Sequence, residues 1–216
     1  MSDRSASSSF IHKYLPAQRD TPVFLLLHGT GGNEDDLIPF AKEISRDSSI
    51  LSVRGKVLEN GMPRFFRRFA EGVFDIEDLK FRTNELADFI EESSDKYNFE
   101  LNQVVAIGYS NGANIGASLL ILRPEVLTGV ILFRGTLPLE TSSLPDLRGK
   151  HVLISGGEFD EIIPQEGTMK LAEVLERAGA QVDLKWQKSN HGLVTADLLA
   201  AKSWAKKNLR TNQDSG

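Results

Sequence analysis

The segment Gly-Tyr-Ser-Asn-Gly at residues 108–112 constrains the fold of this chain more than any other stretch. An apolar, β-branched run precedes it at residues 104–107, and small helix-compatible residues follow it at 113–120. This order predicts a strand that reverses sharply into a helix and presents Ser110 at the corner. Such a corner brings strand and helix close together, which the two glycines permit because they have no Cβ atom. A glycine-rich turn without a catalytic residue could have the same sequence. Whether Ser110 is catalytic therefore has to be judged from the rest of the chain.

Apolar segments alternate with amphipathic ones along the chain. Residues 23–27 are a continuous apolar run, which is typical of a strand buried on both faces of a parallel sheet. We expect further strands at 10–15, 50–53, 103–109, 127–133, 151–155 and 181–186. We expect helices at 34–47, 76–96, 111–122, 165–178 and 195–208. This alternation predicts an α/β fold, with one doubly wound and mostly parallel sheet in a single domain.

The tails of the chain and the length of its apolar runs indicate where the protein is located. We expect the domain at residues 10–210, between disordered polar tails at 1–9 and 211–216. The first tail lacks the apolar segment that a signal peptide needs, and no apolar run is long enough to cross a bilayer. We therefore expect a cytoplasmic protein without a membrane span.

The charged and sulfur-containing residues exclude several functions. The net charge is −5 and there is no long basic block, which argues against binding to nucleic acid. The chain has no cysteine, so disulfides, thiolate catalysis and cysteine-based metal sites are excluded. We expect no cofactor and no metal.

Chemically useful side chains follow several predicted strands at their carboxyl ends. In an open α/β sheet, ligands bind beyond that edge. A glycine-rich loop at residues 28–33 follows the first buried strand, and later strands are followed by Ser110, Asp160 and His191. This chain order of serine, carboxylate and histidine matches the catalytic triad of α/β hydrolases. The sequence therefore predicts a nucleophilic serine with a histidine base.

The base has three competitors, because the chain contains four histidines. His12 lies close to the N-terminus, and His28 precedes the serine. His151 opens a strand and points toward the wrong end of the sheet. His191, in a loop before a glycine, is therefore the expected base.

The acid is expected to be Asp160, which follows a Gly-Gly turn and precedes Pro164 in a short loop. The competing carboxylates are Glu158, Glu161 and Asp183. A solvated loop acid or a helix cap remains an alternative role for Asp160 itself.

The predicted chemistry needs all three residue types and two further donors. A serine hydroxyl is almost un-ionised at neutral pH, so a neutral imidazole must accept its proton during attack. The carboxylate fixes the imidazole tautomer and stabilises the imidazolium. The backbone N–H groups of Asn111 and Thr30 are the expected donors to the oxyanion. A phosphate-binding turn is the alternative for the glycine loop, which however lacks the G-x-G-x-x-G spacing and a P-loop lysine.

Residues 54–75 show no clear periodicity, and their second half, 64–75, contains four phenylalanines and three arginines. The segment either forms a lid that lines an apolar acyl or aryl pocket, or packs over a sheet edge with its arginines in solvent. The residues expected to line a substrate pocket are His28, Gly29, Phe65, Phe66, Phe74 and Ile163.

Four motifs together carry a resemblance to a known family: Leu27–Gly32, Gly108–Ala113, Asp160–Pro164 and His191–Gly192. In this order they resemble the phospholipase/carboxylesterase branch of the α/β hydrolases, small cap-less enzymes that include acyl-protein thioesterases and broad carboxylesterases. The resemblance runs from about residue 23 to the C-terminus. The stretch 64–75 looks closer to a bacterial subset associated with hydroquinone or catechol metabolism.

The resemblance implies roles for individual residues. It implies a triad and an oxyanion hole, formed by Ser110, Asp160 and His191 and by Thr30 and Asn111. Many thioesterase relatives carry Gln and a second Gly around the serine, whereas here Asn111 follows the serine and Ala takes the place of that Gly. This departure disfavours an acyl-protein substrate more than it disfavours ester hydrolysis.

The main hypothesis is a serine carboxylester hydrolase that acts on small or medium acyl or aryl esters through an acyl-enzyme intermediate. An acyl thioesterase or lysophospholipase is the alternative enzyme, and a non-catalytic ligand-binding protein with the hydrolase fold is the alternative outside enzymes. The expected partner is a small-molecule ester, and the sequence leaves open whether the chain forms a homodimer.

Overall fold

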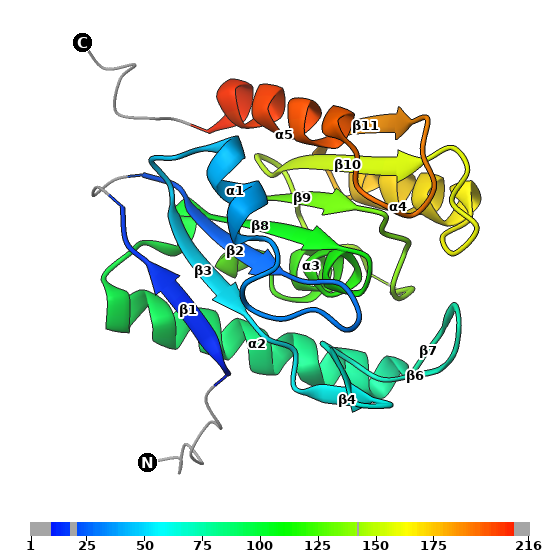
Figure 1. Ribbon diagram of the computed structural model, residues 1–216, viewed down its shortest axis with the longest axis horizontal. Coiled ribbons are helices and arrows are strands. Elements are labelled where there is room, and N and C mark those ends of the chain that lie inside the picture. Colours follow the sequence, from blue (N-terminus) through cyan, green and yellow to red (C-terminus); the bar gives the residue numbers. More distant parts are fainter. Residues whose placement is uncertain (1–9, 18–20, 142, 210–216) are drawn as a thin grey trace.

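The computed structural model describes residues 10–17, 21–141 and 143–209. The tails expected at residues 1–9 and 211–216 lie outside the described residues. The described part is built around a seven-stranded sheet with the strand order β1-β3-β2-β8-β9-β10-β11 (Figure 1). No helix among the described residues combines the length and the apolar character that crossing a bilayer requires.

The central sheet is almost entirely parallel. Its strands are β1 (His12–Leu15), β2 (Val23–Leu27), β3 (Ser49–Val53), β8 (Val104–Tyr109), β9 (Gly129–Phe133), β10 (His151–Gly157) and β11 (Gln181–Gln187). Edge strand β1 pairs with β3 in the antiparallel direction, and all other neighbours in this sheet pair in parallel. The doubly wound, mostly parallel sheet predicted from the sequence is thereby confirmed.

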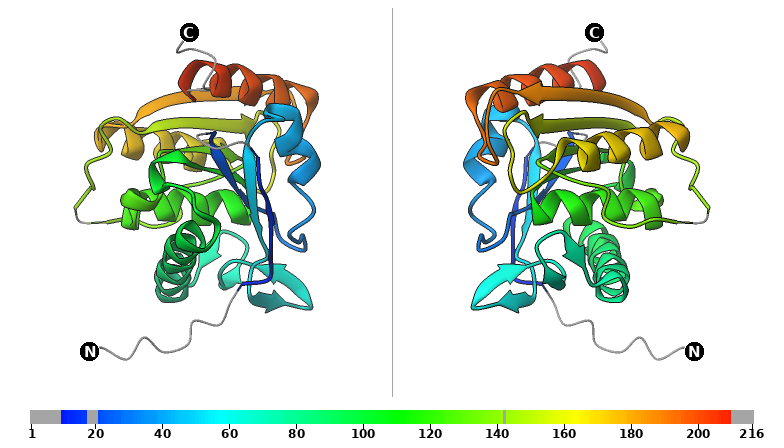
Figure 2. Two further views of the ribbon diagram at one scale, coloured as in Figure 1. Left: turned by 90° about the vertical axis from the view of Figure 1, so that its left-hand side faces the viewer. Right: turned by 90° about the vertical axis from the view of Figure 1, so that its right-hand side faces the viewer.

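Helices cover both faces of this sheet (Figure 2). One face carries α1 (Ile38–Ile44) and α5 (Thr195–Asn208), and the other carries α2 (Ile76–Tyr97), α3 (Asn111–Leu122) and α4 (Gln165–Arg177). Two short 3-10 helices, η1 (Leu101–Gln103) and η2 (Pro124–Val126), precede β8 and β9. All parallel strands therefore end at one edge of the sheet, between the two layers of helices.

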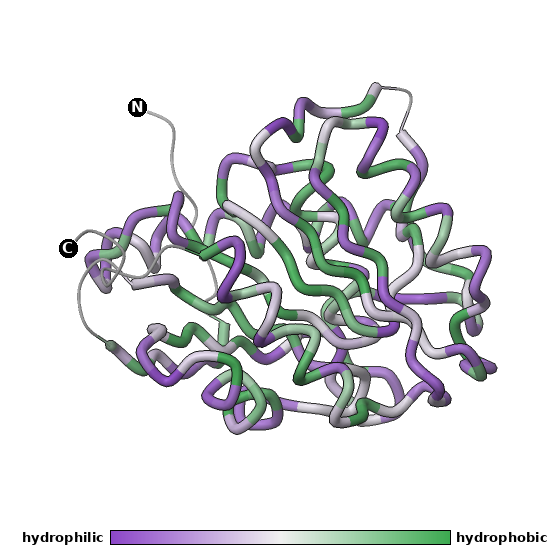
Figure 3. The backbone as a smooth tube through the Cα atoms, turned by 90° about the horizontal axis from the view of Figure 1, so that it is seen from above, coloured by the Kyte–Doolittle hydropathy of each residue, from purple (hydrophilic) through white to green (hydrophobic). Residues whose placement is uncertain are grey.

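Strand β2 shows why the sheet needs continuous apolar runs. Val23, Leu25 and Leu27 belong to the core on the α3 side, whereas Phe24 and Leu26 belong to the core on the α1 side. Successive side chains of a strand point to opposite faces, so a strand covered on both faces needs an apolar residue at every position. Figure 3 shows these hydrophobic strands enclosed by segments of mixed hydropathy.

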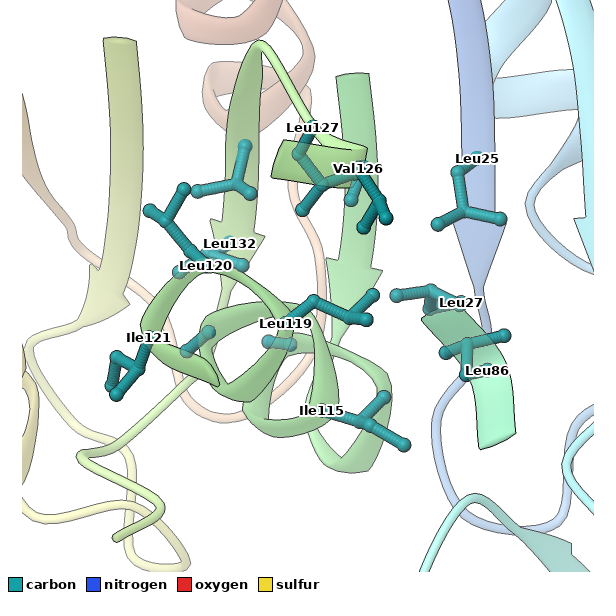
Figure 4. Packing of buried hydrophobic residues seen from close by; sticks show 14 of the residues in the cluster. Leu25, Leu27, Leu86, Ile115, Leu119, Leu120, Ile121, Val126, Leu127 and Leu132 are labelled. Carbon is teal, nitrogen blue, oxygen red and sulfur yellow. The ribbon is translucent and has the colours of Figure 1, made fainter. Parts of the chain in front are cut away.

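Helix α3 lies at the centre of the larger core (Figure 4). Leu119 and Leu120 of this helix are fully buried. Leu27 of β2 and Leu132 of β9 approach Gly116 of α3, so the helix packs closely against both strands. Each fully buried leucine contributes about 1.5–3 kcal/mol relative to exposure. The core thus holds the N-terminus of α3, where Ser110 lies, in a fixed position.

Helix α1 is shorter than expected. It covers only part of the predicted range 34–47, and residues 34–37 form turns instead. Pro39 lies in the first turn of α1, where backbone N–H groups have no acceptor within the helix. The missing N–H of proline therefore costs no hydrogen bond there. The helix therefore begins beside this proline and not at the acidic residues before it.

Residues 54–75 form two hairpins that the sequence did not indicate. The first pairs β4 (Val57–Glu59) with β5 (Met62–Arg64), and the second pairs β6 (Arg68–Ala70) with β7 (Val73–Phe74). Asn60 and Gly61 connect β4 to β5 with positive φ angles of 51° and 80°. An Asn-Gly pair is a known signal for such a turn. The strands on either side are too short to show a period.

Candidate active site

Ser110 lies at a sharp corner between β8 and α3. Its φ of 53° and ψ of −113° are unusual for a residue with a side chain, and its N–H donates to Phe133 O at 2.9 Å. A Cβ atom on Gly112 would lie 1.9 Å from the backbone oxygen of Leu27. A Cβ atom on Gly108 would lie 2.5 Å from the backbone oxygen of Gly112. Only glycine fits both positions, so these residues let the corner close.

The structure brings the three predicted triad residues together at the carboxyl edge of the sheet. His191 Nε2 lies 2.9 Å from Ser110 Oγ, and His191 Nδ1 lies 2.8 Å from Asp160 Oδ2. Asp160 follows β10 and His191 follows β11. Because an ionised carboxylate only accepts hydrogen bonds, Nδ1 carries the proton, and Nε2 is left to accept from the serine hydroxyl.

Competing residues have other partners. His12 hydrogen-bonds the hydroxyl of Tyr97 at 2.7 Å, in the edge strand β1. His151 opens β10, at the opposite end from the triad. Asp183 lies in β11 and pairs with Lys207 at 3.4 Å.

Backbone donors orient the Asp160 carboxylate. Its Oδ1 accepts from the N–H groups of Ile162 at 2.9 Å and Ile163 at 3.0 Å, which leaves Oδ2 facing His191. Helix α4 begins with Pro164 at its N-cap, so Asp160 does not cap this helix. The short loop thus presents one carboxylate oxygen to the imidazole.

A buried ion pair holds the loop that contains His191. Arg134 follows β9 with a positive φ of 54° and pairs with Asp197, and both side chains are fully buried. Its Nε donates to Asn190 O at 3.2 Å, and its Nη2 donates to Gly192 O at 2.8 Å. These carbonyls lie on either side of His191. The Arg134 guanidinium therefore fixes the backbone from which the imidazole extends.

Thr30 and Asn111 lie beside Ser110 in the same pocket. Asn111 is the first residue of α3, and an N–H at that position has no acceptor within the helix. Both residues are tied to the hairpins. Arg64 Nη1 donates to Thr30 Oγ1 at 2.6 Å, and the N–H of Phe65 donates to Asn111 Oδ1 at 2.7 Å. The hairpin segment thus supports the two residues expected to form the oxyanion hole.

His28 lies beneath this loop and is almost fully buried. Its Nδ1 donates to Gly29 O at 2.6 Å, and its Nε2 accepts from the N–H of Gly55 at 3.0 Å. Burial is the main cause that lowers the pKa of His28 below its ordinary value. The neutral ring therefore ties the glycine-rich loop to the start of the hairpin segment.

A cavity of about 240 Å³ opens at Ser110. The residues that line it are Thr30, Arg64, Arg68, Glu71, Gly72, Phe74, Tyr109, Ser110, Asn111, Asn114, Ile162, Ile163 and His191. Of the pocket residues expected from the sequence, Phe74 and Ile163 line the cavity. Four do not, namely His28, Gly29, Phe65 and Phe66.

The correction has a physical reason. Phe65 and Phe66 are buried in the main core, where large apolar rings gain most from leaving water. Arg64 and Arg68 from the same segment take lining positions instead. The segment 54–75 thus forms one wall of the cavity, with charged as well as apolar residues. Within the described residues, no group of three or more His, Asp or Glu side chains is placed to hold a metal ion.

The chain is similar to known proteins in sequence and in fold. A family model described as Phospholipase/Carboxylesterase matches residues 12–209. The putative hydrolase MhqD of Bacillus subtilis (strain 168) is 47% identical over 184 residues, which cover 85% of this chain and 92% of that protein. The structure of the Bacillus cereus carboxylesterase has a TM-score of 0.91 at 46% identity, covering 93% of this chain and 95% of that chain. The structure of YahD with malic acid has a TM-score of 0.87 at 32% identity, covering 92% and 99%.

Proposed function

The chain belongs to the phospholipase/carboxylesterase family, and from this premise we propose that it is a serine carboxylester hydrolase that acts through an acyl-enzyme intermediate. Family membership makes the chain a hydrolase of the carboxylesterase type. The α/β-hydrolase fold expected from the sequence is confirmed by the same matches. The identity of the nucleophile, the intermediate and the substrate size belong to the proposal.

The proposed reaction has two halves. Ser110 Oγ attacks the ester carbonyl carbon while His191 Nε2 accepts the serine proton, and the N–H groups of Thr30 and Asn111 donate to the oxyanion. The tetrahedral intermediate expels the alcohol, which receives the proton from His191. Water then attacks the acyl group on Ser110, again with His191 as base, and the acid leaves. Asp160 stabilises the imidazolium in both halves, and one ester and one water become one acid and one alcohol.

One observation carries this proposal. A continuous series of hydrogen bonds runs from Asp160 through His191 to Ser110, with heavy-atom distances of 2.8 and 2.9 Å. Proton transfer between a general base and its partner needs about 2.6–3.2 Å. Both bonds lie within this range, which supports His191 as the base.

The cavity supports a small substrate. Its volume of about 240 Å³ lies below the range of about 300–1,000 Å³ that is common for drug-sized ligands. The related YahD was solved with malic acid, which is also a small molecule. We expect kcat/KM to be highest for p-nitrophenyl esters of short acids and to fall with acyl length. A rate that rises with acyl length, or that favours thioesters, would instead support a lysophospholipase or thioesterase.

The direct test compares two serine variants on p-nitrophenyl butyrate. We expect Ser110→Ala to lower kcat on the order of 10⁴-fold or more, because the nucleophile is lost. Ser203 lies exposed on α5, so Ser203→Ala is the matched control and should retain the wild-type rate. Equal rates for Ser110→Ala and the wild type would refute the proposal.

A further inference from the structure

Two arginine side chains line the cavity that contains Ser110 and His191. Arg64 extends from the end of β5, and Arg68 from the start of β6. Arg64 is only 2% exposed. An ionised group buried to this degree loses its hydration, so it requires close ionic or hydrogen-bonding partners.

The partners of Arg64 leave much of its charge uncompensated. Its Nη1 donates to Thr30 Oγ1 at 2.6 Å and its Nε to Phe66 O at 3.3 Å, and both acceptors are neutral. Its ion pair with Glu59 is long, at 3.5 Å from Nη1 to Oε2. Its Nη2 donates no hydrogen bond to any residue in the described part of the chain. The Nη2 group of this buried guanidinium is therefore left without an acceptor among the described residues.

The acidic residues nearby pair more closely with Arg68 than with Arg64. Glu59 Oε1 accepts from Arg68 Nε at 3.0 Å, and Glu71 Oε1 accepts from Arg68 Nη1 at 2.6 Å. Glu59 is thus shared between two arginines. The Glu71 side chain is 61% exposed, so solvent screens its charge. Burial is the main cause that lowers the pKa of Arg64, and the positive charge of Arg68 lowers it further, whereas Glu59 and Glu71 act in the opposite direction.

We propose that Arg64 and Arg68 form an anion subsite that selects esters with a carboxylate close to the scissile bond. Nη2 of Arg64 and Nη2 of Arg68 have no acceptor among the described residues, so each can donate a charge-assisted hydrogen bond to a carboxylate oxygen. Arg64 contacts Thr30, the expected oxyanion donor, so a carboxylate bound there lies within a few bonds of the reacting carbonyl. The small cavity restricts the class to short molecules, such as half-esters of short dicarboxylic acids. This inference rests on the proposed esterase function and names its substrate class.

The test measures selectivity with matched pairs of esters. Monomethyl succinate against methyl pentanoate places the carboxylate in the acyl part, and 4-acetoxybenzoate against phenyl acetate places it in the alcohol part. For each pair, the readout is kcat/KM of the anionic ester divided by kcat/KM of the neutral ester. A ratio is needed because Arg64 also supports Thr30, so its loss slows both esters of a pair alike.

The variants are Arg64→Met and Arg68→Gln, with Arg67→Gln as the matched control. Arg67 lies in the same segment, but its side chain is 63% exposed and pairs with Asp75 and Asp78 outside the cavity lining. We expect the wild type to favour the anionic ester in at least one pair. Arg64→Met should lower that ratio about ten- to a hundredfold, because hydrogen bonds to charged groups contribute this much. Arg68→Gln should lower the ratio in the same direction, and Arg67→Gln should leave it unchanged.

The subsite is overturned if the ratio of anionic to neutral kcat/KM is unchanged in both Arg68→Gln and Arg64→Met. It is also overturned if Arg67→Gln lowers this ratio as much as they do. If Arg64→Met does not fold, Arg68→Gln decides. If the wild type hydrolyses no ester, the proposed function has failed, and the subsite is then tested by binding. For Ser110→Ala protein we expect monomethyl succinate, but not methyl pentanoate, to raise the melting temperature, and adding Arg68→Gln should abolish the shift. Equal shifts, or no shift, overturn the subsite.

Discussion

Replacing Asp197 with asparagine tests whether the buried ion pair holds the His191 loop. Asp197 accepts four hydrogen bonds: two from Arg134 at 2.9 and 2.8 Å, one from the Ser155 hydroxyl at 2.7 Å, and one from the N–H of Val194 at 2.8 Å. An amide offers one oxygen and two N–H donors. Asp197→Asn therefore turns an NH₂ group toward existing donors and leaves the Arg134 charge buried without a counter-ion.

The magnitude follows from this geometry. Removing one partner of a buried ion pair costs about 3–5 kcal/mol, because the remaining charge is uncompensated. For a chain of 216 residues, such a loss lowers the melting temperature by about 10 °C. Activity should fall as well, even where the protein stays folded. Arg134 would hold the carbonyls beside His191 less firmly, and a misplacement of about 1 Å can cost about 100-fold in rate.

The assay is urea unfolding followed by tryptophan fluorescence, to which Trp204, buried in α5, and Trp186 of β11 both contribute. The matched control is Asp183→Asn, which breaks a pair with Lys207 whose side chains are 37% and 69% exposed. We expect the control to change the free energy of unfolding by less than about 1 kcal/mol. A loss below about 1 kcal/mol for Asp197→Asn as well would refute the role of the buried pair.

Three further predictions concern the triad, the corner and the glycine-rich loop. Asp160→Asn should lower kcat about 10⁴-fold because the wrong imidazole tautomer is favoured, whereas Glu161→Gln should not; equal kcat values in the two variants would exclude Asp160 as the acid. Gly112→Ala should lose more than about 3 kcal/mol in urea unfolding, because its Cβ would meet backbone at 1.9 Å, whereas Gly116→Ala in the same helix should be tolerated; similar stabilities would contradict the close approach. The lowered pKa of His28 means that below about pH 6.5 the unfolded chain takes up a proton that the folded state resists, so stability falls by at most about 1.4 kcal/mol per pH unit. In urea titrations from about pH 7.5 to about pH 5, His28→Gln should reduce the slope of the free energy of unfolding against pH. An unchanged slope would show that other groups cause the loss of stability at acidic pH.

Features that follow a local rule were predictable from the sequence. The corner at Ser110 follows from two glycines between an apolar run and a helix. His191 was selected by chain order and by its position after a strand. In each case the deciding information lies within a few residues, or in the rule that parallel strands end at the same edge.

The lining of the cavity depends on contacts between distant residues. The run from Arg64 to Phe69 has no period, so the sequence does not show which side chains point inward. That choice depends on the bond from the N–H of Phe65 to Asn111, which lies 46 positions away. The ring of Phe66 packs against Phe74, at 5.2 Å between ring centres. Packing of both rings into the core leaves Arg64 and Arg68 at the cavity, which no local pattern could indicate.

The ion pair between Arg134 and Asp197 joins residues that are 63 positions apart. One signal was present, because Arg134 follows an apolar strand directly, at the edge where ligands bind. A charged residue in that place either contacts a ligand or supports a loop that does. Only the structure distinguishes these two roles, through the carbonyls of Asn190 and Gly192.

The most direct test of the central claim is to treat the protein with a fluorophosphonate probe and to map the modified residue by mass spectrometry. If Ser110 is the nucleophile activated by His191, the probe should modify Ser110 alone, and esterase activity should fall in proportion to the labelling. Labelling should be lost in His191→Gln, which removes the base. A modified residue other than Ser110, or full activity in fully labelled protein, would contradict the assignment of Ser110 as the nucleophile.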